Sequence, residues 1–123
     1  MLYAILCYDS EEVVSAWTKA EDDAVLAKLG EVQAKLAGQG KLGPVARLMP
    51  TTAATTLRKG RESVVLDGPF AETKEALLGF YVVECATLDE ALSIAGELGR
   101  ASSSHGSFEV RPISIFRPGS IQP

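Results

Sequence analysis

The chain opens with an uninterrupted apolar run from Leu2 to Tyr8, which ends at Asp9. Successive side chains of a β-strand point to opposite faces of its sheet, so a strand that is apolar at every position must be covered on both faces. The run therefore predicts a central strand. A small sheet with helices on one face would leave half of this strand bare, so the fold needs a second covering layer.

Two later segments have the spacing of amphipathic helices. Thr18 and Glu21 have capping-box spacing and open the first, and Thr87 and Glu90 repeat that spacing at the second. Apolar residues then recur along one face of each segment and predict the face toward the core. These residues are Val25, Leu29, Val32 and Leu36 in the first segment, and Leu88, Ala91, Leu92, Ala95 and Leu98 in the second. The expected ends are Gly38 or Gly40 for the first helix and Gly99 for the second.

Three more strands are expected, at residues 42–49, 79–85 and 108–116. Pro44 makes the first of them peripheral, and Pro112 favours an edge or a bulge for the last, since proline cannot donate to a neighbouring strand. Residues 55–58 and 63–66 have the pattern of hairpin arms that turn at residues 59–61. The segment 13–17 fits either a short helix or an irregular excursion, and its tryptophan is expected to pack rather than to stack on a ligand.

The order strand, helix, strand, strand, helix, strand is a split βαβ pattern, with the hairpin inserted between the second and third main strands. Its two helices cover one sheet face. A second copy of the chain, packed sheet against sheet, is the economical cover for the other face and predicts a homodimer. Residues 117–123 are poor in apolar side chains and are expected to form a flexible tail or a strap across the dimer.

A length of 123 residues predicts a single domain spanning residues 1–123. The net charge of −4 argues against a nucleic-acid partner, and no apolar run approaches a membrane span, so we expect no membrane partner and a cytoplasmic protein. Cys7 and Cys85 lie in strand-like runs without metal-ligand spacing and are expected to be buried free thiols. We expect no metal and no tightly bound cofactor.

The candidate chemistry centres on the turn Asp67–Phe70. An Asp in a turn usually accepts a hydrogen bond from the N–H two residues later, but here that residue is Pro69, which has no N–H. The carboxylate of Asp67 is therefore left to a later amide such as that of Phe70, to solvent, to a cation or to a ligand. Asp67 is accordingly both our candidate general acid or base and, in the alternative, a simple turn cap.

Further residues complete this candidate site. Arg58 or Lys74 would anchor an anionic group, although each is equally suited to a surface ion pair. Phe70 and Tyr81 would form an apolar wall, with core packing as the alternative for the tyrosine. His105 is the one histidine of the sequence and a natural proton carrier, but its serine-rich surroundings (residues 102–104) suggest an exposed loop.

Several spaced motifs resemble the DGPF branch of the YCII-related family. They are Asp67–Phe70 with the following Ala71–Glu75, then Gly79–Tyr81, Ala54–Arg58, Leu88–Leu92 and Val110–Ile113. The resemblance covers nearly the whole chain and implies a ferredoxin-like α+β domain that pairs into a dimeric α+β barrel. It also implies a His–Asp pair with the histidine near the first helix, where this chain has none.

Two functions follow as hypotheses, and a purely structural dimerisation module is a third. The first is a cofactor-independent enzyme that performs isomerase- or lyase-like acid–base chemistry on a small, anionic metabolite in a cleft between barrel and hairpin. This class rests on analogy with related dimeric barrels. The second is a non-enzymatic ligand-binding or accessory protein, since family members are often encoded beside alternative sigma factors. Whether the chain is an enzyme stays open.

Overall fold

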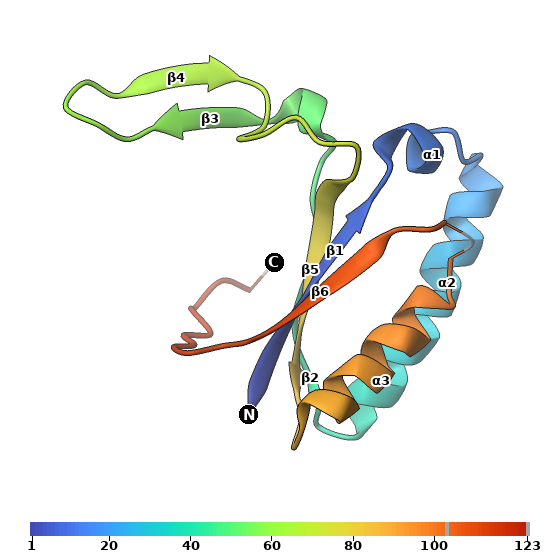
Figure 1. Cartoon of the computed structure of the whole chain (residues 1–123). Helices are drawn as coiled ribbons and strands as arrows, with labels where there is room; N and C mark the ends of the chain where they lie inside the picture. The colour runs from blue at the N-terminus through green and yellow to red at the C-terminus, as the bar shows by residue number, and fades with distance from the viewer. Residues whose placement is uncertain (103, 123) are drawn as a thin grey trace.

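A four-stranded antiparallel sheet forms the centre of the computed structural model, which describes residues 1–102 and 104–122 (Figure 1). The strands lie in the order β2-β5-β1-β6. Their bounds are β1 Leu2–Asp9, β2 Leu42–Arg47, β5 Ala76–Glu84 and β6 Ser107–Pro112. The apolar first strand is central, as predicted, and the proline-containing β2 lies at an edge. With two long helices this order is the ferredoxin-like α+β arrangement that the sequence predicts.

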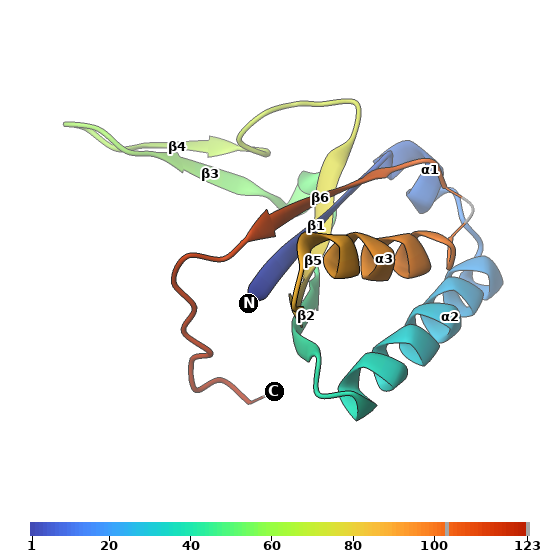
Figure 2. The ribbon, with the colours of Figure 1, turned by 60° about the horizontal axis from the view of Figure 1, so that its bottom comes forward.

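The two long helices, α2 (Lys19–Gly38) and α3 (Leu88–Gly99), cover the same face of the sheet (Figures 1 and 2). The predicted capping box of α2 is confirmed. The Glu21 N–H donates to Thr18 Oγ1 at 3.1 Å, and the Thr18 N–H donates to Glu21 Oε1 at 3.0 Å. These two bonds satisfy donors that would otherwise lack partners at the first turn of the helix.

Of the two hydrogen bonds expected in the second capping box, at the start of α3, only one forms. The Glu90 N–H donates to Thr87 Oγ1 at 3.2 Å, but the Glu90 carboxylate accepts from the Ala86 N–H at 3.0 Å instead of from the cap residue. Its second oxygen lies 2.6 Å from the ammonium of Lys41, just before β2. The ion pair with a distant residue thus draws this carboxylate away from the reciprocal bond that its spacing predicts.

The core lies between the sheet and the helices. Its buried residues come from β1, β5, α2 and α3 and are Tyr3, Ile5, Leu36, Tyr81, Val83, Cys85, Ala91, Ile94, Ala95 and Leu98. On α3 the predicted stripe is partly wrong: Leu88 and Leu92 are about half exposed, and Ile94 is buried in their place. On α2 only Leu36 of the predicted stripe is fully buried. The half-buried Val25 and Leu29 face a cavity described below.

The ambiguous segment after β1 is a short helix, α1 (Glu11–Ser15). The carboxylate of Glu11 accepts the Thr51 N–H at 2.7 Å and also the Thr51 hydroxyl, in the 3-10 turn η1 (Thr51–Ala53). These bonds lower the pKa of Glu11, the hydroxyl contributing most. They tie α1 to the segment that leads into the hairpin.

The predicted hairpin forms a separate two-stranded sheet of β3 (Thr55–Arg58) and β4 (Val64–Asp67). It projects from the body as an arm, on the side of the main sheet away from the helices (Figures 1 and 2). Leu57 pairs with Val65, and both are well exposed, at 58% and 66%. Isolated hairpins are only marginally stable in water, so we expect an arm with exposed apolar side chains to be stabilised by packing against another surface.

The last strand ends at Pro112, four residues earlier than predicted. The Ile113 N–H still donates to the Leu2 carbonyl at 2.8 Å, after which the chain leaves the sheet. The tail then runs on the side away from the helices (Figures 1 and 2). Its exposed apolar residues include Ile115 and Ile121.

Candidate functional site

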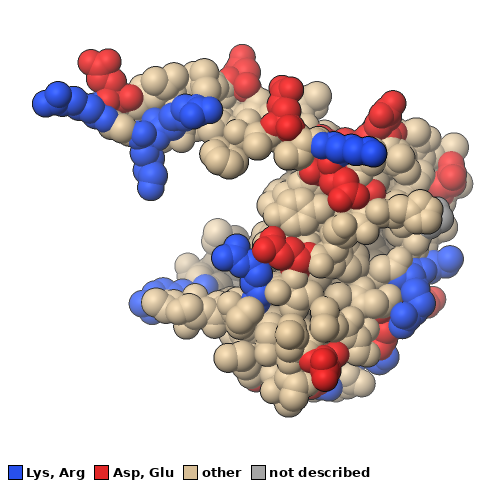
Figure 3. All heavy atoms as spheres, in the orientation of Figure 1, with Lys and Arg blue, Asp and Glu red and all other residues tan. Residues whose placement is uncertain are grey.

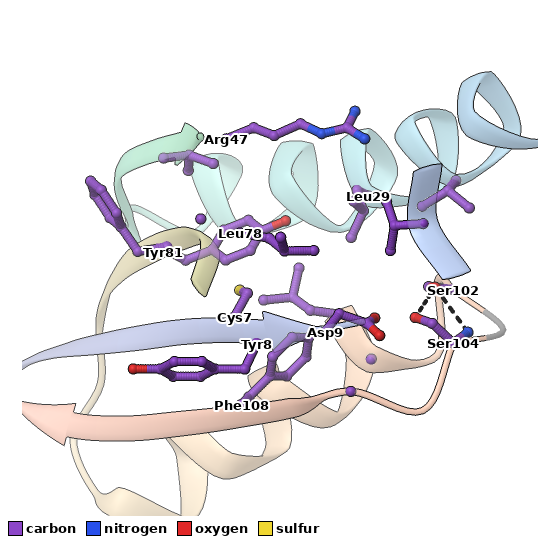
Figure 4. A pocket seen from close by; sticks show the side chains of 18 of the residues that line it. Cys7, Tyr8, Asp9, Leu29, Arg47, Leu78, Tyr81, Ser102, Ser104 and Phe108 are labelled. Carbon is purple, nitrogen blue, oxygen red and sulfur yellow. Dashed lines mark hydrogen bonds between the residues drawn. The ribbon is translucent and has the colours of Figure 1, made fainter. Parts of the chain in front are cut away.

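A cavity of about 460 Å³ lies between the helix-bearing face of the sheet and the helices (Figure 4). Its walls are mainly apolar and include Val25 and Leu29 of α2, Leu78 of β5 and Phe108 of β6. Four glycines also line it: Gly79 in β5, Gly96 and Gly99 in α3, and Gly106 just before β6. Because glycine has no side chain to fill the space, Gly96 and Gly99 leave room between α3 and the sheet, whereas Gly79 permits the close approach of the β2 backbone at Ala46.

An ion pair stands at the rim of the cavity. Arg47, at the end of β2, directs two nitrogens toward Asp22 of α2, with Nη2 2.9 Å from Oδ1 and Nη1 3.4 Å from Oδ2. Both residues line the cavity. The Arg47 side chain is about half exposed, so the pair contributes at most about 1 kcal/mol to stability. Its consequence is geometric: it holds α2 to the edge strand beside the opening.

A second carboxylate, that of Asp9, lies where β1 ends. Oδ1 accepts the Ser10 N–H at 2.7 Å, and the side chain is half-buried and lines the cavity (Figure 4). Gly106 passes so close that a Cβ there would stand 2.8 Å from Asp9 Cγ and 2.1 Å from the Tyr8 carbonyl oxygen. A glycine at this position therefore makes the placement of the carboxylate possible.

Two serine hydroxyls occupy the same end of the cavity. The Oγ atoms of Ser102 and Ser104 lie 2.6 Å apart, and the Ser104 N–H donates to Ser102 Oγ at 3.2 Å (Figure 4). Both residues are half-buried, which differs from the fully exposed linker that the sequence predicts. They add hydrogen-bonding groups to a wall that is otherwise mostly apolar.

Cys7 and Tyr81 contribute neutral groups. Burial raises the pKa of the Cys7 thiol to about 12, so the group is protonated at neutral pH and is not a ready nucleophile. Burial likewise raises the pKa of Tyr81, whose phenol stays protonated. Among the residues that line the cavity, the carboxylates are Asp9 and Asp22, and Asp22 is held by Arg47. Asp9 is thus the acidic group best placed to exchange a proton with a bound molecule.

The sequence-predicted site residues do not come together around this cavity. Tyr81 is buried and lines it. Asp67 lies at the exposed end of β4, Arg58 is near the tip of the arm, and Phe70 is 83% exposed. Lys74 and His105 are also exposed and do not line it.

The turn after β4 explains why its motif has this form. Gly68 has a φ of 103°, which favours glycine, its N–H donates to the Ala54 carbonyl at 2.8 Å, and its own carbonyl accepts the Thr56 hydroxyl at 2.8 Å. In the described residues no hydrogen bond or ion pair involves the Asp67 carboxylate. The turn therefore secures the base of the arm, and a catalytic role of Asp67 stays a prediction.

The residues that line the cavity do not stand out in the sequence as site residues. In the sequence, Asp9 serves only to mark the end of the apolar run that begins at Leu2. Trp17, predicted to be a packing residue, is half-buried and lines the cavity. The serines carry no sequence signal, because their position depends on how the loop after α3 folds back over β1.

No group of three His, Cys, Asp or Glu side chains arranged to hold a metal ion occurs within residues 1–102 and 104–122. Over the same residues, none of the helices is both long enough and apolar enough to cross a bilayer.

Comparison with known proteins places the chain in a family. Residues 1–117 match the YCII-related domain. An uncharacterized protein of Rhizobium meliloti (strain 1021) is 59% identical over 122 residues, a match that covers 98% of each chain. A domain match over nearly the full length, together with this relative, shows that the chain belongs to the YCII-related domain family.

Proposed function

We propose that this protein binds a small, largely apolar molecule between its sheet and helices and acts on it by proton transfer through Asp9. The observation that carries the proposal is a mainly apolar cavity of about 460 Å³ with a half-buried carboxylate at one end. Small-molecule sites typically have volumes of about 300–1,000 Å³, apolar walls and a few converging polar groups. The serine pair and the Arg47–Asp22 pair are such groups.

The reaction class that fits is proton abstraction and return, as in an isomerase or a lyase. It requires one group that changes protonation state and neighbours that orient the substrate. Asp9 is the first, and the hydroxyls of Ser102 and Ser104 are suited to the second. The thiol of Cys7 and the phenol of Tyr81 are protonated at neutral pH, so they serve as donors or as wall.

Binding is tested with a neutral fluorescent probe, 1-aminoanthracene. We expect wild type to bind it and Leu29→Trp to bind it at least tenfold more weakly, because the larger side chain fills the cavity. The matched control is Ala34→Trp, which adds the same indole on the exposed side of the same helix. Equal binding by all three proteins would place the probe elsewhere and refute the cavity as a binding site.

Chemistry is tested by incubating the protein with a metabolite panel in D₂O and following deuterium uptake and product formation by NMR. We expect turnover that is lost in Asp9→Asn and retained in Asp67→Asn. Turnover that is lost in Asp67→Asn and retained in Asp9→Asn would assign the proton-carrying role to Asp67, with Arg58, Phe70 and Lys74 as its candidate neighbours. Binding without turnover in wild type would support the accessory, ligand-binding role instead.

We also infer that two copies associate through the sheet face that lacks helices. On this face Leu6 of β1 pairs with Phe80 of β5, and no helix covers either strand (Figures 1 and 2). Figure 3 shows an open gap between the arm and the body, with Lys and Arg side chains at the far end of the arm. A second copy seated in this gap would cover the face and one side of the arm, and the exposed cross-strand pair of Leu57 and Val65 is our candidate for that side.

Light scattering coupled to size-exclusion chromatography tests this association. We expect a dimer at micromolar concentration and a monomer for Leu57→Asp/Val65→Asp, a cross-strand pair on one side of the arm. Val64→Asp, on the opposite side of the arm, is the control and is expected to remain dimeric. A wild-type monomer would exclude the homodimer.

A further inference from the structure

A second, smaller cavity of about 310 Å³ adjoins the first. Trp17, Val25 and Ser102 line both, so the two hollows are neighbours on either side of these residues. The chemistry of the smaller one is different: its outer wall carries the cations Lys28 and Arg100, together with Glu21. The larger hollow thus offers apolar surface, and its neighbour offers charge.

The acid in the smaller cavity already has a structural role. Glu21 accepts the Thr18 N–H in the capping box, and this backbone N–H, followed by the Thr18 side chain, lowers the pKa of the carboxyl. The carboxylate is therefore charged and held against the start of α2. Two cations and one acid leave the hollow with a net positive charge.

Neither Lys28 nor Arg100 forms an ion pair in the described part of the chain, and Arg100 lies near Glu97, whose carboxylate is paired with Lys35. The neighbouring lysines of α2 are paired: Lys19 lies 2.8 Å from Asp23, and Lys35 lies 2.8 Å from Glu97. Lys28 makes no such pair. The residue four positions after Lys28 is Val32, so the helix itself offers no counterpart of the Lys19–Asp23 pair.

Arg100 lines the smaller cavity, and its side chain lies against α3. Its Nη1 would lie 3.4 Å from a Cβ built on Gly96, so the guanidinium folds back along α3 toward a residue that lines the larger cavity. A side chain at Gly96 would crowd it. The planar fork of an arginine matches both oxygens of a carboxylate, which a lysine ammonium does not.

We propose that the ligand is an amphipathic carboxylate, with its apolar body in the larger cavity and its carboxylate between Arg100 and Lys28 in the smaller one. The chain of the ligand passes beside Trp17 and Ser102, which line both spaces. This inference rests on the proposed binding function, and it adds the charge of the ligand and its orientation. It also places the anion-binding cations on α2 and after α3, and not at Arg58 or Lys74.

The test compares octanoate with octanamide, which has the same length but no charge, as competitors of bound 1-aminoanthracene. In wild type we expect octanoate to compete about tenfold more strongly, a ratio equivalent to about 1.4 kcal/mol. Added salt is expected to reduce the preference, because the cations are exposed. Lys28→Gln/Arg100→Gln is expected to abolish it while leaving the affinity for octanamide unchanged.

The control variant Lys19→Gln/Lys59→Gln removes two lysine charges from outside both cavities and is expected to keep the preference. Equal competition by the two compounds in wild type would overturn the carboxylate inference and leave cavity binding intact. A preference for octanoate that survives in Lys28→Gln/Arg100→Gln would also overturn the carboxylate inference and leave cavity binding intact. A probe that does not bind, or that binds Leu29→Trp as well as wild type, would overturn the proposed function and this inference together.

Discussion

Replacing Gly106 by alanine tests the close approach that positions Asp9. The added Cβ would stand 2.1 Å from the Tyr8 carbonyl oxygen and 2.8 Å from Asp9 Cγ, far inside van der Waals contact. The first of these atoms is backbone in a central strand and cannot rotate away. Overpacking of this kind typically costs about 1–3 kcal/mol, and we expect Gly106→Ala to lower the free energy of unfolding by that amount.

Gly30→Ala is the matched control, with the same added methyl group. Nothing lies within 4 Å of a Cβ at Gly30, which is in the interior of α2. Alanine favours helix over glycine, so this variant is expected to gain about 0.5–1 kcal/mol. The two substitutions therefore have opposite signs although they are chemically identical.

Urea unfolding followed by far-UV circular dichroism, at one fixed protein concentration, measures both variants. Probe titration is the second readout, since displacement of Asp9 should weaken binding in Gly106→Ala but not in Gly30→Ala. A Gly106→Ala protein as stable as wild type would refute the close approach, and with it our account of how the carboxylate is held at the cavity.

Three further predictions concern stability. Leu98→Ala is expected to lower the free energy of unfolding by about 2–5 kcal/mol, because this side chain is fully buried. Leu92→Ala, at a half-exposed position of the same helix, should lower it by less than about 1 kcal/mol. Urea titration measures both. Thr18→Ala is expected to cost about 1 kcal/mol through loss of the α2 cap, measured in the same way. The Lys41 contact is the largest cause of the lowered pKa of Glu90, and the same contact raises the pKa of Lys41 above 10.5. The stability contributed by this pair should thus be present between about pH 4.5 and 10.5 and decrease below and above that range. Thermal melts at a series of pH values test this, and in Glu90→Gln we expect the part of the pH dependence that is due to the pair to disappear.

Local patterns are sufficient to predict most of the fold. The run from Leu2 to Tyr8 predicts the central strand because side chains alternate between the two faces of a sheet, so apolar residues at every position require cover on both. The Thr18 cap and the inserted hairpin depend on contacts close in sequence, and both are confirmed. The second capping box fails at Glu90 because a lysine that is distant in the chain competes for the same carboxylate.

The cavity could not be predicted in the same way. Its existence depends on a helix stripe that packs only partly and on glycines brought together from β5, α3 and the loop before β6, which no local pattern encodes. Asp9 becomes a candidate only when the loop bearing Ser102 and Ser104 folds back beside it. For Asp67, the turn chemistry indicates a carboxylate without a local backbone partner, but an acid that lacks a partner need not adjoin a cavity.

The prolines of the two edge strands limit how copies of this protein can meet. Pro44 lies in β2 and Pro112 in β6, so each border of the main sheet has a position without an N–H to donate. The pairing of β2 with β5 is also irregular between Leu42 and Val45, which disturbs that border further. Strand-by-strand growth into a continuous ribbon is thereby discouraged at both sides, which agrees with the association proposed above through the face of the sheet instead of its edges.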